Sequence, residues 1–158
     1  MKYFSDECSD IDGHSEQLKQ MKSRFSDETN TFLATNSFHD AHIMDINIKN
    51  LFNPDVGGEE DDPTLIEAHL LHWNGDKYVV KWHGVNKYLM DYDIHRNTYE
   101  DSDKIAFDGQ RGLDDWITDE ITAYDEVYLT HKIILASDTK IEIRFKKIDI
   151  KKIGVKPS

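Results

Sequence analysis

The stretch Phe38-His39-Asp40-Ala41-His42-Ile43-Met44-Asp45-Ile46-Asn47-Ile48 leads from a compact polar cluster directly into a strand-like alternation. From Met44 onward, apolar and polar side chains alternate, as in a strand with one face buried and the other in water. Residues 14–34, which precede the stretch, instead carry apolar side chains at helical spacings. The sequence therefore predicts a helix that turns onto a sheet at this stretch.

Further strands are expected along the rest of the chain, most clearly in two hairpins. Their turns are Asn74-Gly75-Asp76 and Ser137-Asp138-Thr139, which contain residues that tolerate the positive φ of a tight turn. Residues 113–121 fit either a short helix or a loop. The predicted strands are 44–52, 65–73, 77–85, 86–93, 104–107, 126–136 and 140–150.

These elements predict an α+β fold in which an N-terminal helix packs on a curved, mainly antiparallel sheet of about six to eight strands. A chain of 158 residues is long enough to bury a core without disulfides or metals. We expect a single domain over residues 1–158, with the helix at about 14–34 and the sheet at about 43–150.

Cysteine usage and hydropathy indicate the compartment. Cys8 is the one cysteine, so neither an internal disulfide nor a cysteine-based zinc site is available. The first residues lack the apolar run of a signal peptide, and no segment approaches the ~18 apolar residues of a membrane span. We therefore expect a soluble, cytoplasmic protein that does not bind a membrane.

Charge separates the possible partners. The formal net charge is −12, which argues against nucleic-acid binding because the phosphate backbone would be repelled. Residues 91–126 hold twelve carboxylates against three basic residues, whereas residues 140–156 hold seven basic residues against two acids. The molecule is predicted to be polarised, with an acidic surface suited to a basic protein partner.

The acidic segment also contains Trp116, which we interpret as an interface anchor ringed by charge, whereas Trp73 and Trp82 are expected in the core. The predicted partner-binding residues are Asp101, Asp103, Asp114, Asp115, Trp116, Asp119 and Glu120.

The polar cluster at the helix–sheet junction has two interpretations. His39, Asp40 and His42 have the side-chain chemistry of a zinc, nickel or iron site. Alternatively, Phe38, His39 and Asp40 form a structural corner in which the Asp40 carboxylate accepts hydrogen bonds from main-chain amides. The structural interpretation is favoured, since His39 and His42 would face opposite sides of a regular strand. Neither a nucleophile elbow nor a glycine-rich phosphate loop is present, so we predict no catalytic residues and no cofactor.

Two segments carry a resemblance to known proteins. Phe38-His39-Asp40-Ala41-x-Ile43-x-x-Ile46 and the late strand Ile141-x-Ile143-x-Phe145-x-x-Ile148-x-Ile150 resemble a group of small bacterial α+β proteins. That group includes predicted immunity proteins of polymorphic toxin systems. The resemblance implies a cytoplasmic binding protein and transfers no active site.

The hypothesis that follows is an immunity-type protein, not an enzyme, that binds and neutralises a basic toxin domain encoded nearby through its acidic surface. One alternative is a metal-binding protein or metal-dependent enzyme that uses His39, Asp40 and His42. Another is a small-ligand binding domain with its site in a cavity of the sheet.

Overall fold

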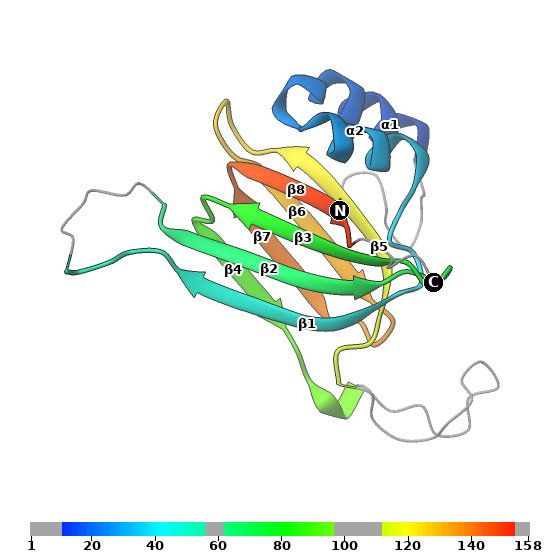
Figure 1. Ribbon diagram of the computed structural model, residues 1–158. Helices are drawn as coiled ribbons and strands as arrows, with labels where there is room; N and C mark the ends of the chain where they lie inside the picture. The colour runs from blue at the N-terminus through cyan, green and yellow to red at the C-terminus, as the bar shows by residue number, and fades with distance from the viewer. Residues whose placement is uncertain (1–10, 56–61, 97–111, 154–158) are drawn as a thin grey trace.

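The computed structural model describes residues 11–55, 62–96 and 112–153. Within these residues, two α-helices precede an eight-stranded antiparallel sheet, so the predicted α+β class is confirmed (Figure 1). The helices are α1 (Ile11–Gln20), the 3-10 turn η1 (Lys22–Arg24), α2 (Asp27–Thr35) and the 3-10 turn η2 (Ile94–Arg96). The strands are β1 (Ala41–Asn50), β2 (Thr64–Leu71), β3 (Lys77–His83), β4 (Lys87–Asp91), β5 (Asp115–Ala123), β6 (Leu129–Leu135), β7 (Lys140–Phe145) and β8 (Lys147–Lys152). The strand predicted at 104–107 lies outside the described residues.

The helical region differs from the single helix predicted at 14–34. It is broken after α1, and α2 restarts at Ser26, whose side-chain oxygen accepts a hydrogen bond from the Thr29 N–H at 3.2 Å. Ser26 is followed by two acidic residues, which favour a helix N-terminus because they complement its dipole. The N-cap at Ser26 therefore starts a second helix within the segment whose apolar spacing predicted a single one. Of the helices in the described segments, none is long and apolar enough to cross a membrane.

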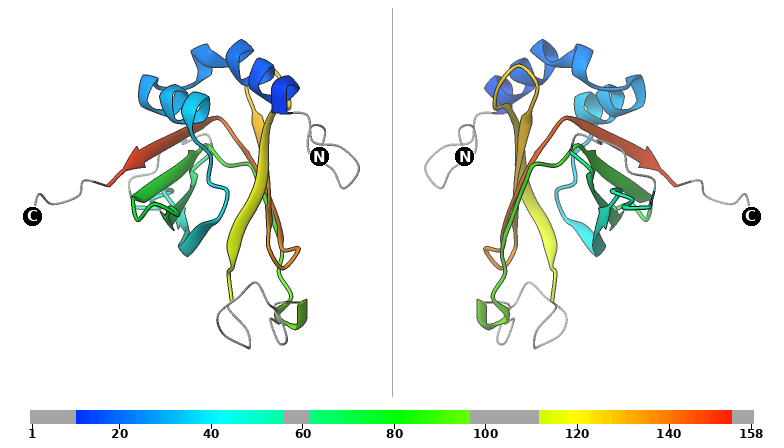
Figure 2. Two further views of the ribbon diagram at one scale, coloured as in Figure 1. Left: turned by 90° about the vertical axis from the view of Figure 1, so that its right-hand side faces the viewer. Right: turned by 90° about the vertical axis from the view of Figure 1, so that its left-hand side faces the viewer.

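The sheet consists of two halves. Its strand order is β4-β7-β6-β5-β1-β2-β3-β8, but β1 and β5 pair only through Ala41 with Trp116 and His42 with Asp115. Figure 2 shows the halves edge-on as two separate limbs with the helices lying across one end. Because α1 packs on β5 and α2 on β8, the helices bridge the two halves.

Two predicted elements are wrong in this region. Residues 113–121 form neither a helix nor a loop, because most of them belong to strand β5. Residues 140–150 are not one strand, since the chain bends at Lys146 and passes from β7 in one half to β8 in the other. The Lys146 N–H donates to the His83 carbonyl at 2.9 Å, which fixes the bend beside β3.

The core lies between the inner faces of the two halves and the helices. The alternation predicted for β7 is confirmed, since Ile141, Ile143 and Phe145 are buried. Of the two tryptophans predicted in the core, Trp82 is buried but Trp73 is 73% exposed beside the β2–β3 turn. Gly75 in that turn has a φ of +91°, as the turn signal predicted.

Candidate functional site

Phe38, His39 and Asp40 form the corner between α2 and β1. Phe38 is buried, and its ring lies 4.5 Å from that of Phe32 and 5.1 Å from that of Trp116, centroid to centroid. The Ala41 N–H donates to the Phe38 carbonyl at 2.8 Å, which closes a four-residue turn. The corner therefore joins the helical layer to both halves of the sheet.

The corner is held differently from the predicted arrangement. The His39 ring nitrogen Nδ1 is 2.6 Å from the carbonyl oxygen of Ile117, and the Asp40 N–H donates to the Trp116 carbonyl at 2.8 Å. Asp40 thus contributes its main chain to the corner, and its φ of +64° places it in the left-handed region. Aspartate tolerates this region better than most residues with a Cβ do.

This conformation makes a prediction for position 40. Asp40→Val should lower the free energy of unfolding by about 1–2 kcal/mol, because a β-branched residue is strained at positive φ. Asp40→Gly should leave it nearly unchanged, since glycine adopts this φ without steric cost. Urea unfolding measures both, with Asp55→Val as the control at an exposed position of ordinary φ. Equal stability of the valine and glycine variants would show that the backbone conformation is not what selects Asp40.

The metal hypothesis receives no support from the arrangement of its residues. His39 Nε2 lies 3.4 Å from Asp40 Oδ2, while His42 Nδ1 lies 3.6 Å from the carboxylate of Asp115. The histidines thus form two separate pairs. Across the described segments, no three histidine, cysteine or acidic side chains come together as a metal-binding group.

Several residues predicted to bind a partner are buried instead of exposed. Asp114, Trp116 and Glu120 are each at most 2% exposed, so the interpretation of Trp116 as an interface anchor is wrong. Asp115 is half-buried, and Asp101 and Asp103 lie outside the described residues. Trp116 packs in the core against Phe38 and His131, and the Asp114 carboxylate accepts a hydrogen bond from the Ser137 hydroxyl at 3.2 Å.

A change of register explains why the sequence of β5 hid its inner face. The β5–β6 pairing shifts between Trp116 and Thr118, so the residues that point inward switch from even to odd positions. Trp116 before the shift and Ile121 after it are both buried. Asp119 follows the same parity as Ile121 and turns its carboxylate toward the interior.

Asp119 belongs to a hydrogen-bonded network that links β3, β5 and β6. Its Oδ1 accepts from the Trp116 indole N–H at 3.1 Å, and its Oδ2 lies 2.6 Å from His131 Nε2. The Trp82 indole N–H donates to His131 Nδ1 at 3.1 Å. Because an indole nitrogen can only donate, Nδ1 must accept and the His131 proton resides on Nε2, facing Asp119. Both ring nitrogens are therefore used within the protein.

A cavity of about 530 Å³ lies between the helices and this network, with His14, Asp119 and His131 among its lining residues. The Ile121 N–H donates to His14 Nε2 at 3.1 Å, which ties α1 to β5. Burial lowers the pKa of His14 below its ordinary value of 6.5, against the opposing effect of the Asp119 and Glu120 charges. Among the described residues that line the cavity, the one buried imidazole is that of His131, and both of its ring nitrogens are hydrogen-bonded within the protein.

Exposed carboxylates gather at the end of the sheet where β4 ends and β6 turns into β7. Asp91 and Asp93 are exposed at the end of β4. Asp91 stands opposite Lys140 in the β4–β7 ladder, and Lys140 follows the turn that contains the exposed Asp138. These three carboxylates lie at or beside the adjoining ends of the neighbouring strands β4 and β7.

The same end of the sheet continues across β5 to the corner. The Asp115 carbonyl accepts from the Ala136 N–H at 2.9 Å, beside the β6–β7 turn, and the Asp40 carboxylate is exposed next to the start of β5. We define the acidic end as Asp40, Asp91, Asp93, Asp115 and Asp138. Of the residues predicted to bind a partner, only Asp115 belongs to the acidic end. The sequence could not show that Asp40 and Asp138 lie beside residues of the acidic segment 91–126.

Comparison with known proteins finds a solved structure of low similarity. No protein-family model matches this chain, and no curated protein matches it. A crystal structure of an uncharacterized protein from Neisseria gonorrhoeae is similar over 74% of this chain and 95% of that chain, with 17% sequence identity and a TM-score of 0.45.

Proposed function

We propose that this protein is an immunity-type binding protein whose acidic end docks onto a basic toxin domain and blocks it sterically. The observation that carries the proposal is the acidic end itself, where exposed carboxylates from the α2–β1 corner, the end of β4 and the β6–β7 turn lie beside the half-buried Asp115 at one end of the sheet. The net charge of −12 acts in the same direction. A toxin that acts on nucleic acid carries positive charge for its own substrate, which makes it the fitting class of partner.

The polar groups around His131 have a structural role. His131, the most enclosed imidazole beside the cavity, has one nitrogen bonded to Trp82 and the other to Asp119. A general base needs a nitrogen free to take a proton from a substrate. The network therefore links β3, β5 and β6 in the interior of the protein.

The proposal is tested by neutralising the exposed carboxylates of the acidic end. The variant changes Asp40, Asp91, Asp93 and Asp138 to asparagine, which keeps the side-chain size and tolerates the positive φ of Asp40 and Asp138. Co-purification with the product of the adjacent gene, followed by binding kinetics at two salt concentrations, is the measurement. We expect affinity to fall by about tenfold or more, mainly through slower association, and the salt dependence to weaken.

A control variant removes the same amount of charge elsewhere. It changes Asp27, Glu28, Asp55 and Glu126 to the corresponding amides, and all four are exposed away from the acidic end. This variant should retain most of the affinity. If both variants lose affinity equally, net charge and not the acidic end drives binding; if neither loses any, the proposed surface is wrong.

A further inference from the structure

Strand β1 has one edge paired and most of the other edge unpaired. Residues 42–50, apart from Met44 at the register shift, pair with β2, whereas the pairing with β5 stops at His42. Figure 1 shows β1 diverging from β5 beyond that point and running along the margin of its half of the sheet. Over the described part of the chain, the second edge of β1 thus presents main-chain N–H and C=O groups to solvent, as an edge strand does.

The inner-face side chains along this edge do not protect it from pairing. Ile48 is 57% exposed, and Met44 is half exposed at the register shift that precedes the regular part of the strand. Edge strands usually avoid association through charged side chains, prolines, inward-pointing charges or short length. Residues 45–49 have none of these on their inner face, where Ile46 and Ile48 lie.

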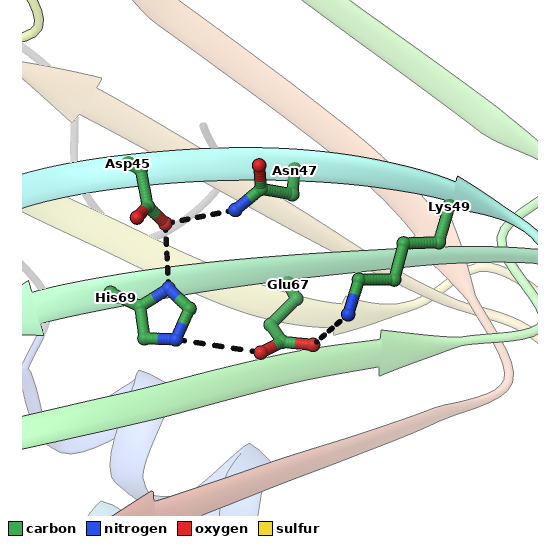
Figure 3. Close-up of polar contacts among 5 residues, drawn as sticks. All are labelled: Asp45, Asn47, Lys49, Glu67 and His69. Carbon is green, nitrogen blue, oxygen red and sulfur yellow. Dashed lines mark hydrogen bonds and ion pairs between the residues drawn. The ribbon is translucent and has the colours of Figure 1, made fainter.

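The outer face of the same five residues carries an ordered set of charges. Figure 3 shows Asp45, Asn47 and Lys49 in a row along β1. Asp45 Oδ1 lies 2.6 Å from His69 Nδ1 and accepts from the Asn47 amide at 3.0 Å, and Lys49 Nζ lies 3.0 Å from the Glu67 carboxylate (Figure 3). Along β1, an acidic residue therefore stands two positions before Asn47 and a basic residue two positions after it.

This arrangement is self-complementary in one antiparallel register. Directly opposed residues of an antiparallel ladder point to the same side, so a two-fold axis between two copies of β1 must pass through a residue pair. An axis at Asp45 would oppose two aspartates, and an axis at Lys49 would oppose two lysines. An axis at Asn47 sets Asp45 against Lys49 of the second copy, twice.

The apolar face agrees with the same register. With the axis at Asn47, Ile46 stands opposite Ile48 of the second copy, so the exposed isoleucine of each chain is covered by the other. Axes at Ile46 or Ile48 leave both charged residues without an opposite charge facing them. The Asn47 axis is thus the register in which both faces match.

We propose that a second copy of this chain pairs with the free edge of β1 in this register, joining the two sheets across a two-fold axis at Asn47. Lys49 then lies between Glu67 of its own chain and Asp45 of the second copy. The charge network drawn in Figure 3 continues from one subunit into the other. A second copy is the occupant, because an unrelated strand would have no reason to mirror the spacing of Asp45 and Lys49. The dimer involves none of the carboxylates of the acidic end.

A charge-swap experiment tests the register. Asp45→Lys sets two lysines against each other on both sides of the axis, and Lys49→Asp sets two aspartates there. Each single variant should weaken dimerisation by about tenfold or more, because the two-fold axis applies every change twice. The double variant, Asp45→Lys with Lys49→Asp, should restore dimerisation. Analytical ultracentrifugation over a range of concentrations measures all of these, with circular dichroism to confirm folding.

Mixing the two single variants gives the sharpest result. A chain with lysine at both positions and a chain with aspartate at both positions oppose unlike charges only in the heterodimer, which should form although neither variant self-associates. Lys151→Asp, an exposed charge reversal on β8 away from the edge, should leave the dimer intact. The proposal is overturned if the wild type stays monomeric at every concentration, if the single variants dimerise normally, or if the folded single variants fail to form the heterodimer. None of these outcomes bears on partner binding by the acidic end.

Discussion

Trp116→Ala should lower the free energy of unfolding by about 3–5 kcal/mol, the usual cost of truncating a fully buried aromatic side chain. Trp116 is 1% exposed, its ring contacts those of Phe38 and His131, and its indole N–H binds Asp119. The substitution leaves a cavity at the place where β1 and β5 meet. Because this pairing is the narrow joint between the two halves of the sheet, loss of packing there is not easily absorbed by relaxation.

Urea unfolding of the wild type and two further variants completes this test. Trp73→Ala, at a tryptophan that is 73% exposed, should change the free energy of unfolding by less than about 0.5 kcal/mol. Trp116→Phe keeps an aromatic ring but removes the indole N–H donor. Its loss of unfolding free energy should therefore fall between those of Trp73→Ala and Trp116→Ala. A Trp116→Ala protein with wild-type stability and lost partner affinity would instead restore Trp116 as an interface anchor.

The contrast between these tryptophans shows what the sequence could predict. Where a strand is regular, alternation alone identified the buried face, as for Ile141, Ile143 and Phe145 in β7. In β5 a shifted register changes the parity, so Trp116 and Ile121 point inward although they are five positions apart. Acidic residues on both sides of Trp116 then gave the strand the composition of a surface segment.

The bend at Lys146 left a weaker signal in the sequence. Phe145 and Ile148 are both buried and three positions apart, which a continuous strand cannot satisfy on one face. That change of parity marks the passage from β7 to β8 and could have been recognised. The partner of β8 could not, because its pairing with β3 joins residues about seventy positions apart in the chain.

The candidate site shows the same limit. A compact acidic segment was visible in the sequence, but the acidic end depends on Asp40 and Asp138, which tertiary structure brings to the same end of the sheet. The Asp119 network was not predictable, since Trp82 and His131 become its neighbours only when β3 and β6 face each other across the core. A buried polar residue is identified by its hydrogen-bond partners, and the sequence does not show which distant residues these are.

Asp119→Asn should lower the free energy of unfolding by about 1–3 kcal/mol, because it forces two buried donors to face each other. An asparagine that keeps its oxygen toward Trp116 turns its amide N–H toward the Nε2–H of His131. The imidazole cannot escape by moving its proton to Nδ1, since the Trp82 indole N–H occupies that side. Flipping the asparagine only moves the conflict to the indole of Trp116.

Removing the Trp82 donor should therefore rescue the asparagine. Trp82→Phe leaves His131 free to carry its proton on Nδ1 and to accept at Nε2, so Asp119→Asn should cost at least about 1 kcal/mol less in the Trp82→Phe background than in the wild type. The control cycle combines Asp119→Asn with Trp73→Phe, at an exposed tryptophan outside the network. In this cycle the two losses of unfolding free energy should be additive. Urea unfolding of the four proteins in each cycle measures the coupling. Additive costs in the Trp82 cycle would mean that the Trp82 indole does not fix the His131 tautomer.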